Sequence, residues 1–223
     1  MEPIAYIRTD FPEKFGIPRQ SGIIEELEGT IIFKEKYRNP EALRGLEGFS
    51  HIWLIWLFSG CSRDSFQATV RPPRLGGKTR LGVFATRSPF RPNPIGLSCV
   101  RLEGLVQLPG YGTVLKVRGA DLKDRTEILD IKPYIPFSDS RPDASSGFIE
   151  TAPWQELEVN IPPALIPLIP ADKLSALIQV LKCDPRSSDK KNSGKSSGLS
   201  FAGMNIRFSV ENNLLTVTSV ERL

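Results

Sequence analysis

The stretch Arg87–Ser98, RSPFRPNPIGLS, holds two guanidinium groups in a loop with little backbone freedom. Arg87 and Arg91 offer planar, permanently charged forks that suit a carboxylate or a phosphate. Proline fixes φ, so a loop of this composition loses little conformational entropy when it binds a ligand. The prolines occupy three of six consecutive positions: Pro89, Pro92 and Pro94.

Two neighbours extend the chemistry of this loop. The amide of Asn93 can read the edge of a base or a ribose, and Gly96 lets a ligand approach the backbone closely. The alternative is a rigid structural turn whose arginines pair with acidic neighbours. The residue types alone leave both interpretations open.

The second candidate is Ala120–Ser140, which begins with acidic residues and ends in a Lys-Pro-Tyr turn. If residues 128–131 form a strand, Asp130 projects on one face, where Lys132 can lie beside it. The pair is then either a structural ion pair or a base held near a reacting nitrogen, with the hydroxyl of Tyr134 nearby.

Other reaction classes lack their residues. The chain has one histidine, His51, placed before an apolar strand and without a GxSxG elbow, so we interpret it as structural. No cluster of Cys, His or carboxylates has metal-ligand spacing, and no Walker A or GxGxxG loop occurs. The stretch RLGGK at Arg74–Lys78 is too short to identify a phosphate loop, and a tight hairpin turn explains it equally well.

Positive charge is concentrated in one interval. No acidic residue lies between Asp64 and Glu103, and the seven cations there exceed the net charge of +4 of the whole chain. Such a segment is typical of a surface that binds a phosphate backbone, although a solvated basic surface is the alternative. The cations are Arg71, Arg74, Lys78, Arg80, Arg87, Arg91 and Arg101.

Composition points to a reduced, cytoplasmic protein without a membrane segment. The N-terminus lacks an apolar signal region, and the longest apolar run, Ile52–Phe58, is too short to span a bilayer. Cys61, Cys99 and Cys183 are widely spaced and form no CxxC pair, which argues against disulfides and a zinc site.

The elements that position these candidate residues are predicted to be strands, because strand signals dominate residues 1–152. Short β-branched or aromatic runs alternate with Gly and Pro clusters, which is typical of a closed or nearly closed barrel. A turn at Leu108–Gly112 separates two strands, and Pro40–Phe49 has room for one or two helical turns. The expected strands are Ile4–Arg8, Gly29–Phe33, His51–Phe58, Arg80–Thr86, Ile95–Leu105 and Thr113–Ala120.

Residues 153–223 form a second, small α+β unit in our interpretation, so the chain is mainly β and α+β overall. A helix is predicted at about 172–183, with an apolar face and Asp172 as its cap. A mobile Ser/Lys/Gly-rich loop is expected at 187–198. A β-hairpin is expected at about 204–221, with its turn at Asn212–Asn213.

Several ordered segments together resemble the TsaA-like family, whose characterised branch methylates threonylcarbamoyladenosine beside the tRNA anticodon with S-adenosylmethionine. The resemblance is specific in the first 150 residues and looser after Pro153. The matching segments are Glu13–Gly22, Leu43–Ile55, Val70–Gly77, Gly82–Ser98 and Leu129–Ser140.

The resemblance implies a β-barrel methyltransferase fold and a homodimer with the cofactor near the subunit contact. Two departures from the family pattern concern Ser59–Gly60, where a histidine and an amide or acid are usual, and Asp124–Glu127, where D-G-T-P is usual. Carried over by position, the cofactor contacts are Ser21, Gly22, Ile23, Ser59, Gly60, Arg87, Leu97, Gly119, Ala120 and Asp121.

Methyl transfer from a sulfonium needs positioning and neither a metal nor a covalent intermediate. We therefore expect Asp130 to act as the base or orienting group, with Lys132 and Tyr134 in support. Arg87 would bind the cofactor carboxylate, while Arg91 and Asn93 would face the modified base. The expected contacts to the anticodon stem-loop are Arg71, Arg74, Lys78, Arg80 and Arg186.

Three rival functions remain at this point. A non-enzymatic RNA-binding barrel would use the same loop without a cofactor. A small-molecule regulator would bind S-adenosylmethionine without RNA, which the basic interval disfavours. A methyltransferase with another acceptor would keep the cofactor site and differ in the loops.

Overall fold

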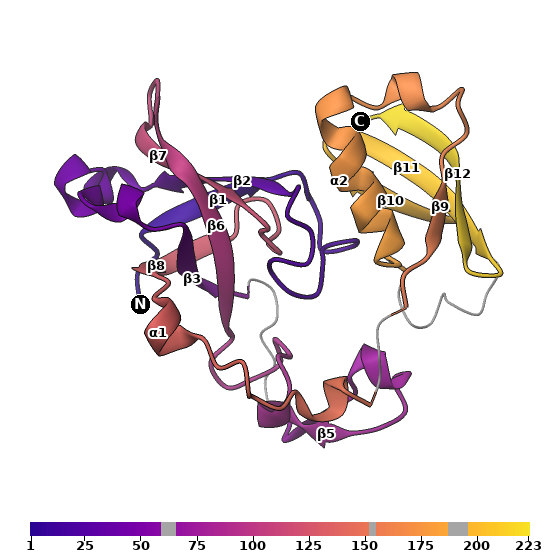
Figure 1. Ribbon diagram of the computed structural model, residues 1–223, viewed down its shortest axis with the longest axis horizontal. Coiled ribbons are helices and arrows are strands. Elements are labelled where there is room, and N and C mark those ends of the chain that lie inside the picture. Colours follow the sequence, from indigo (N-terminus) through magenta and orange to yellow (C-terminus); the bar gives the residue numbers. More distant parts are fainter. Residues whose placement is uncertain (59–65, 152–154, 187–195) are drawn as a thin grey trace.

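The computed structural model describes residues 1–58, 66–151, 155–186 and 196–223 (Figure 1). Six strands of the N-terminal half pair in the cyclic order β1-β2-β7-β6-β3-β8, and β8 pairs back with β1. The mainly β prediction is confirmed. These strands are β1 Ala5–Thr9, β2 Glu28–Phe33, β3 His51–Leu57, β6 Ile95–Leu108, β7 Gly112–Arg118 and β8 Glu127–Pro133.

Alternating side chains explain why these strands form a ring. In β3, Ile52, Leu54 and Trp56 are buried inside, whereas the residues between them are only half-buried on the outer face. This period of two places one apolar row on the inner face, where it packs against the same rows of the other strands. The ring closes through the register pairs Ala5↔Ile128 and Tyr6↔Glu127.

One predicted strand is mostly wrong. In place of Arg80–Thr86 the structure has the two-residue strand β5, Leu81–Gly82, paired with β4, Thr69–Val70, and then a 3-10 turn, η5, at Val83–Ala85. The chain turns there because Val83 is buried at 1% exposure. Between β4 and β5, Gly76 and Gly77 have positive φ, so RLGGK lies in a hairpin loop.

The first half also contains short helical turns. The stretch Pro40–Phe49, where one or two helical turns were expected, contains two 3-10 turns, η2 Pro40–Leu43 and η3 Leu46–Gly48. Another, η4 Pro73–Leu75, lies between β4 and β5. A single turn of α-helix, α1, follows β8 at Pro136–Asp139. The other 3-10 turns besides η5 are η1 Glu35–Tyr37, η6 Gly147–Ile149 and, in the second half of the chain, η7 Ile166–Leu168.

The C-terminal part is a four-stranded sheet with one helix, α2, Ala171–Lys182. The hairpin turn at Asn212–Asn213 is confirmed, because both residues have positive φ. Asp172 does not cap the helix, since Pro170 is at the N-cap and Asp172 lies in the first turn, near the positive end of the helix dipole. The strands are β9 Glu158–Asn160, β10 Ser197–Phe201, β11 Met204–Glu211 and β12 Leu214–Arg222.

Sequence reasoning missed β9 and β10. β9 runs parallel to β12, and β10 extends the hairpin on its other edge. The expected mobile loop 187–198 is therefore too long, because Ser197 and Gly198 belong to β10; its part 187–195 lies outside the described residues.

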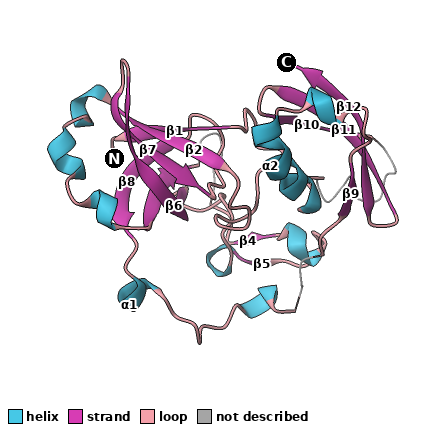
Figure 2. Ribbon diagram, turned by 45° about the horizontal axis from the view of Figure 1, so that its top comes forward, coloured by secondary structure: helices cyan, strands magenta, loops and turns pink. Residues whose placement is uncertain are grey.

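The protein has two hydrophobic cores. One fills the ring, and the second takes residues from both halves of the chain. Phe11 and Leu27, from the segment between β1 and β2, pack with α2 and the C-terminal sheet. The rings of Phe11 and Phe201 lie 5.2 Å apart. A Cβ on Gly16 would come within 2.2 Å of Leu199. In both views α2 stands between the ring and the sheet (Figures 1 and 2).

Neither described cysteine is bonded: Cys99 and Cys183 are free thiols, and burial raises the pKa of both. Cys61 lies outside the described residues. Across the described ranges, no helix has the length and apolar character needed to cross a membrane.

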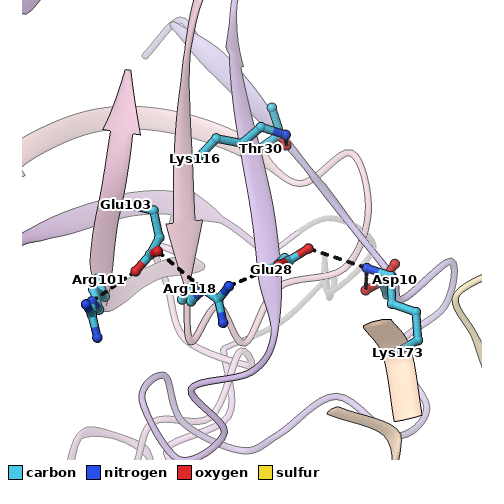
Figure 3. A network of polar contacts seen from close by, with 8 residues as sticks. All are labelled: Asp10, Glu28, Thr30, Arg101, Glu103, Lys116, Arg118 and Lys173. Carbon is cyan, nitrogen blue, oxygen red and sulfur yellow. Dashed lines mark hydrogen bonds and ion pairs between the residues drawn. The ribbon is translucent and has the colours of Figure 1, made fainter. Parts of the chain in front are cut away.

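A row of alternating charges connects the ring to α2 (Figure 3). Lys173 of α2 lies 2.8 Å from Asp10 and 3.6 Å from Glu28, and Glu28 pairs with Arg118 of β7 at 3.3 Å. The row continues from Arg118 to Glu103, 3.5 Å away. The side chains of Lys173 and Asp10 are only about one-fifth exposed, at 20% and 19%.

We expect Lys173→Met to lower the free energy of unfolding by about 1–2 kcal/mol, because it leaves the mostly buried carboxylate of Asp10 without its cation, whereas Glu28 keeps Arg118. Burial alone would lower the pKa of Lys173, but Asp10 and Glu28 raise it above its ordinary value. Its contribution is therefore full below the ordinary pKa of 10.5 and is lost as pH rises through the folded pKa.

Urea unfolding from about pH 6 to pH 9 measures this difference, which should be constant over that range. The matched control is Lys36→Met, since Lys36 pairs with Glu2 at 3.2 Å on the open surface and its loss should leave stability unchanged. Equal effects of the two substitutions would contradict the prediction.

Candidate functional site

A cavity of about 450 Å³ lies where the end of β3 meets the loop Arg87–Pro94 before β6, called here the Arg–Pro loop. Its other walls are the segment 14–20, which precedes β2, and the segment 121–126, which precedes β8. The apolar part of the wall includes Trp56 and Phe58, whose ring centroids are 4.2 Å apart.

The charged groups of the cavity are unbalanced. Among the described residues that line it, Asp121 is the single carboxylate. Five cationic side chains line the cavity from three segments of the chain, so the cavity favours a ligand that presents anionic groups such as a carboxylate or a phosphate. The cations are Lys14, Arg19, Arg87, Arg91 and Lys123.

Asp121 is held by a chain of hydrogen bonds that begins inside the ring. The indole Nε1 of Trp56 donates to Ser98 Oγ at 3.0 Å, and this hydroxyl donates to Asp121 Oδ1 at 2.6 Å. Burial raises the pKa of the Asp121 carboxyl, while Ser98, the charge of Arg87 and the backbone N–H of Ser21 act in the opposite direction. The carboxylate is thus fixed in orientation and poorly solvated.

Two glycine turns bring together the segments expected to bind the cofactor. Gly22 N donates to Gly119 O at 2.9 Å, and both residues have positive φ. A Cβ on Gly119 would lie 3.3 Å from the backbone of Gly22, so the two turns touch. Ser21 Oγ accepts from Cys99 N at 3.1 Å, which fixes this turn against β6.

The expected cofactor residues therefore converge, as far as they are described. Arg87 and Leu97 line the same cavity as Asp121, and Arg87 Nη1 donates to Gln20 Oε1. Ile23 is 54% exposed beside the Gly22 turn. Ala120 is buried, and Ser59 and Gly60 lie outside the described residues.

Gly96 lines the cavity, and the structure gives a second reason for a glycine at this position. A Cβ at this position would come within 2.2 Å of the Trp56 indole. The Trp56 ring therefore packs against the backbone of Gly96, in space that a side chain would fill. The same ring donates a hydrogen bond to Ser98.

The Arg–Pro loop is internally braced. Arg91 Nη1 donates to Thr86 O at 2.9 Å and to Ser88 O at 3.3 Å, so the guanidinium closes the loop on itself while facing the cavity. Asn93 is exposed and is not among the lining residues of the cavity. These bonds brace the first part of the loop, and the fixed φ of Pro92 and Pro94 restricts the part after Arg91.

Asp130 and Lys132 lie side by side, as the strand pattern predicted, with Nζ and Oδ2 2.9 Å apart. Neither they nor Tyr134 are among the lining residues of the cavity. Asp130 pairs in register with Ile55, and Ile55 pairs with Leu97, so the three share one row on the outer face. At the usual strand spacing, Asp130 is about 10 Å from cavity-lining Leu97.

Tyr134 continues the same outer face at its other end. Its N–H donates to His51 O at 3.0 Å, and its ring lies 5.7 Å from that of Trp53. The indole of Trp53 donates to Asp139 of α1 at 3.0 Å. His51 Nδ1 is 2.9 Å from the Oγ atom of its neighbour Ser50.

The basic residues of the β4–β5 hairpin lie on the surface, with Arg71, Lys78 and Arg80 exposed. Arg74 lies close to Arg19, which lines the cavity. Burial lowers the pKa of Arg19, the charge of Asp184 raises this pKa, and the charge of Arg74 lowers it further. Arg186 is engaged within the chain, with Nε 2.8 Å from Asp184 Oδ1 and a side chain only 12% exposed.

Sequence reasoning missed several residues of this site. Lys14, Arg19 and Lys123 are isolated cations in the sequence, and Trp56 and Ser98 have the alternating pattern of ordinary core residues. Two signals were available: the segment Glu13–Gly22 had been singled out for its resemblance, and Ser98 ends the stretch Arg87–Ser98. No described group of three or more His, Cys, Asp or Glu side chains could hold a metal ion.

We expect Asp121→Asn to stabilise the protein at pH 7, because it removes a buried carboxylate whose pKa is raised by burial. The destabilising contribution of wild-type Asp121 is absent below the ordinary pKa of 3.8 and grows as pH rises through the folded pKa. The increase in melting temperature should therefore shrink towards about pH 4.

Thermal melts across this pH range measure the effect, with the exposed Asp143→Asn as the control. A variant that gains no stability, or gains the same at both ends of the range, would disprove the proposed environment of Asp121.

Comparison with known proteins identifies the family of this chain. Residues 6–140 match the tRNA-methyltransferase O N-terminal domain. The chain is 40% identical over 228 residues to the tRNA (adenine(37)-N6)-methyltransferase of Escherichia coli, a match that covers 99% of this chain and 97% of that protein. It is also 40% identical over 149 residues to a "Probable S-adenosyl-L-methionine-binding protein" of Pyrococcus abyssi, covering 66% and 74% of the two chains.

A solved structure agrees with this result. The crystal structure of TrmO from Pseudomonas aeruginosa superposes with a TM-score of 0.80 at 34% identity, and the match covers 99% of this chain and 95% of that one. The fold, the converging glycine turns and the full-length match lead to one conclusion: the chain belongs to the tRNA-methyltransferase O family.

Proposed function

We propose that this chain transfers a methyl group from S-adenosylmethionine to N6 of threonylcarbamoyladenosine in tRNA, forming the N6-methylated nucleoside. The reaction class follows from the family, because the relative that matches the whole chain is named a tRNA (adenine(37)-N6)-methyltransferase. The observation that carries the proposal is the cavity beside the braced Arg–Pro loop, which five cations line together with Asp121, the one carboxylate among its described lining residues.

The cavity fits S-adenosylmethionine, which supplies the electrophilic methyl group when it is bound. Arg87 would pair with the carboxylate of the cofactor, and Asp121 would accept hydrogen bonds from its amino or hydroxyl groups. Trp56 and Phe58 offer apolar surface in the same cavity. The turns at Ser21–Ile23 and Gly119–Asp121, together with Leu97, would complete the contacts, with Ser59 and Gly60 as further candidates.

Asp130 is our candidate for the group that takes the proton from N6. A carbamoyl group makes this nitrogen a poor nucleophile but its proton more acidic, so one carboxylate within hydrogen-bond reach is sufficient. Lys132 would orient Asp130 through their 2.9 Å contact, and Tyr134 would support the acceptor. The position of Asp130 in one row with Ile55 and Leu97 supports the assignment, since that row leads to the cavity.

The RNA would lie across the β4–β5 hairpin and the mouth of the cavity. Arg71, Lys78 and Arg80 are exposed cations suited to phosphates of the anticodon stem-loop, and Arg74 lies close enough to Arg19 to lower its pKa. The acceptor base would be unstacked so that it reaches the methyl donor. Arg91 and Asn93 would face this base, and Arg186 would contact the RNA only if it exchanged its bond with Asp184.

Four broader assignments complete the proposal. The six-stranded ring serves as a closed methyltransferase barrel, supported by the return of β8 to β1, with residues 1–152 as one domain and 153–223 as the other. The protein acts in the cytoplasm as a homodimer. Ile23 and Leu97, which are 54% and 55% exposed beside the cofactor turns, support a subunit contact at that place.

The proposal is tested by mass spectrometry of nucleosides from tRNA that lacks the methyl mark, after incubation with the protein and S-adenosylmethionine. We expect a gain of one methyl on threonylcarbamoyladenosine. Asp130→Ala should lower kcat by about 10²–10⁴-fold, and Tyr134→Phe less, because a general base contributes about that much.

Binding of S-adenosylmethionine, measured by calorimetry, should be unchanged in both variants. Wild-type turnover by both folded variants would remove the catalytic assignment. Methylation of unmodified adenosine, with no preference for the carbamoylated form, would instead identify another acceptor.

Salt dependence tests the RNA surface separately. We expect tRNA affinity to fall steeply with salt, and Arg80→Ala to reduce the slope of log K against log[salt] by about one, because one phosphate contact is lost. Lys36→Ala is the control, since the charge of Lys36 is already paired with Glu2. Fluorescence anisotropy at several salt concentrations measures the slope, and a flat response would contradict an RNA surface here.

A further inference from the structure

Two phenylalanine rings stand exposed beside the basic hairpin. Phe66 is 59% and Phe84 is 72% exposed, and their rings are stacked with centroids 6.3 Å apart and planes inclined by 26°. Phe84 belongs to η5, which follows β5 directly. Side chains of this size usually bury most of their area, so the pair offers an apolar face that nothing described covers.

Phe84 is presented on a firm support. Its neighbour Val83 is buried at 1% exposure, and Val83 N donates to Ala68 O at 2.9 Å, which ties the turn to the β4 side of the hairpin. Thr86 Oγ1 donates back to Val83 O at 2.9 Å and closes the turn. Phe84 is therefore pushed outward by the packing of its neighbours and has little freedom to fold inward.

Arg91 connects this ring to the cavity. Its guanidinium carbon lies 6.0 Å from the ring centroid of Phe84, within the range of a cation–π contact. The same guanidinium lines the cavity. A planar group stacked on Phe84 would thus lie beside the wall that the Arg–Pro loop forms, next to a ligand bound in the cavity.

The exposed cations Arg71, Lys78 and Arg80 of the adjoining hairpin favour an occupant with negative charge. Phe66 and Phe84 both lie in the interval without acidic residues between Asp64 and Glu103. A partner with an apolar face and a negatively charged backbone matches this combination, and a single-stranded nucleotide has both. Aromatic side chains commonly stack the unpaired bases of RNA loops.

We propose that Phe84, supported by Phe66, stacks on a base next to the acceptor adenosine and so holds the RNA loop open while the acceptor occupies the cavity. This inference rests on the proposed function, since it assigns a positioning residue to the RNA substrate of the same site. Phe84 binds no cofactor and takes no part in proton transfer.

The test compares Phe84→Ala, Phe84→Leu and Phe84→Trp in the full-length protein. Loss of one stacked base should raise KM for the tRNA about tenfold in the alanine variant, with little change in kcat. Tryptophan should restore the wild-type value. Leucine should not, because it keeps apolar area but has no planar face.

Three further measurements make the comparison specific. Calorimetric affinity for S-adenosylmethionine and the salt slope of tRNA binding should both be unchanged in Phe84→Ala, because no charge or cofactor contact is lost. A 5-iodouridine placed next to the acceptor should crosslink to Phe84 on irradiation. Tyr111→Ala is the matched control, since Arg38 lies 5.7 Å from the Tyr111 ring in the β6–β7 turn, away from β4 and β5 (Figures 1 and 2).

The outcomes separate the inference from the proposed function. An unchanged KM in Phe84→Ala while the wild type methylates tRNA would overturn the stacking role and leave the function intact. Rescue by leucine, or a changed mass in light scattering, would mean that Phe84 contacts another protein surface, such as a second copy of the chain. Failure of the wild type to bind or methylate tRNA would reject the function itself.

Discussion

The segment between β1 and β2, residues 10–27, packs into the C-terminal hydrophobic core while both of its ends join strands of the ring, and the cavity depends on this arrangement. Phe11 and Leu27 are anchored in the C-terminal core, and Gly16 lets Leu199 approach the backbone closely. Between these anchors, Lys14 to Gln20 form one wall of the cavity. The C-terminal sheet thus shapes the site without lining it, and the row of charges from Lys173 to Arg118 holds the two halves together.

The chemistry of the site follows from where charge is buried. Ser98 donates a hydrogen bond to Asp121 and is itself hydrogen-bonded by Trp56, which fixes the carboxylate in the cavity that the cations line. Burial raises the pKa of this carboxyl. Methyl transfer gains most of its rate from the alignment of acceptor and donor, so rigid positioning groups matter more than strong acids or bases. The braced Arg–Pro loop and the outward-facing Phe84 suit this requirement, because both are fixed by bonds within the loop and the turn.

Local patterns predicted the elements whose signal is contained in a few residues. Runs of β-branched and aromatic residues predicted five of the six ring strands, and the sixth, β8, was considered only as a possible strand at 128–131. An i, i+3, i+4, i+7 pattern predicted α2, and Asn212–Asn213 predicted the hairpin turn. The errors came where contacts outside the element decide its structure. β9 exists because it pairs with the distant β12, and the predicted strand at Arg80–Thr86 is broken because Val83 turns into the interior.

The sequence by itself determined the mainly β class, the basic interval, the stiffness of the Arg–Pro loop and the segments that resemble the family, because each is a property of neighbouring residues. Only the tertiary structure decided that Lys14, Arg19 and Lys123 line one cavity with Asp121 and that Trp56 fills the space over Gly96. Such contacts join residues that are far apart in the chain. Their geometry depends on closure of the ring and on the packing of residues 10–27 against the second core, which no local pattern records.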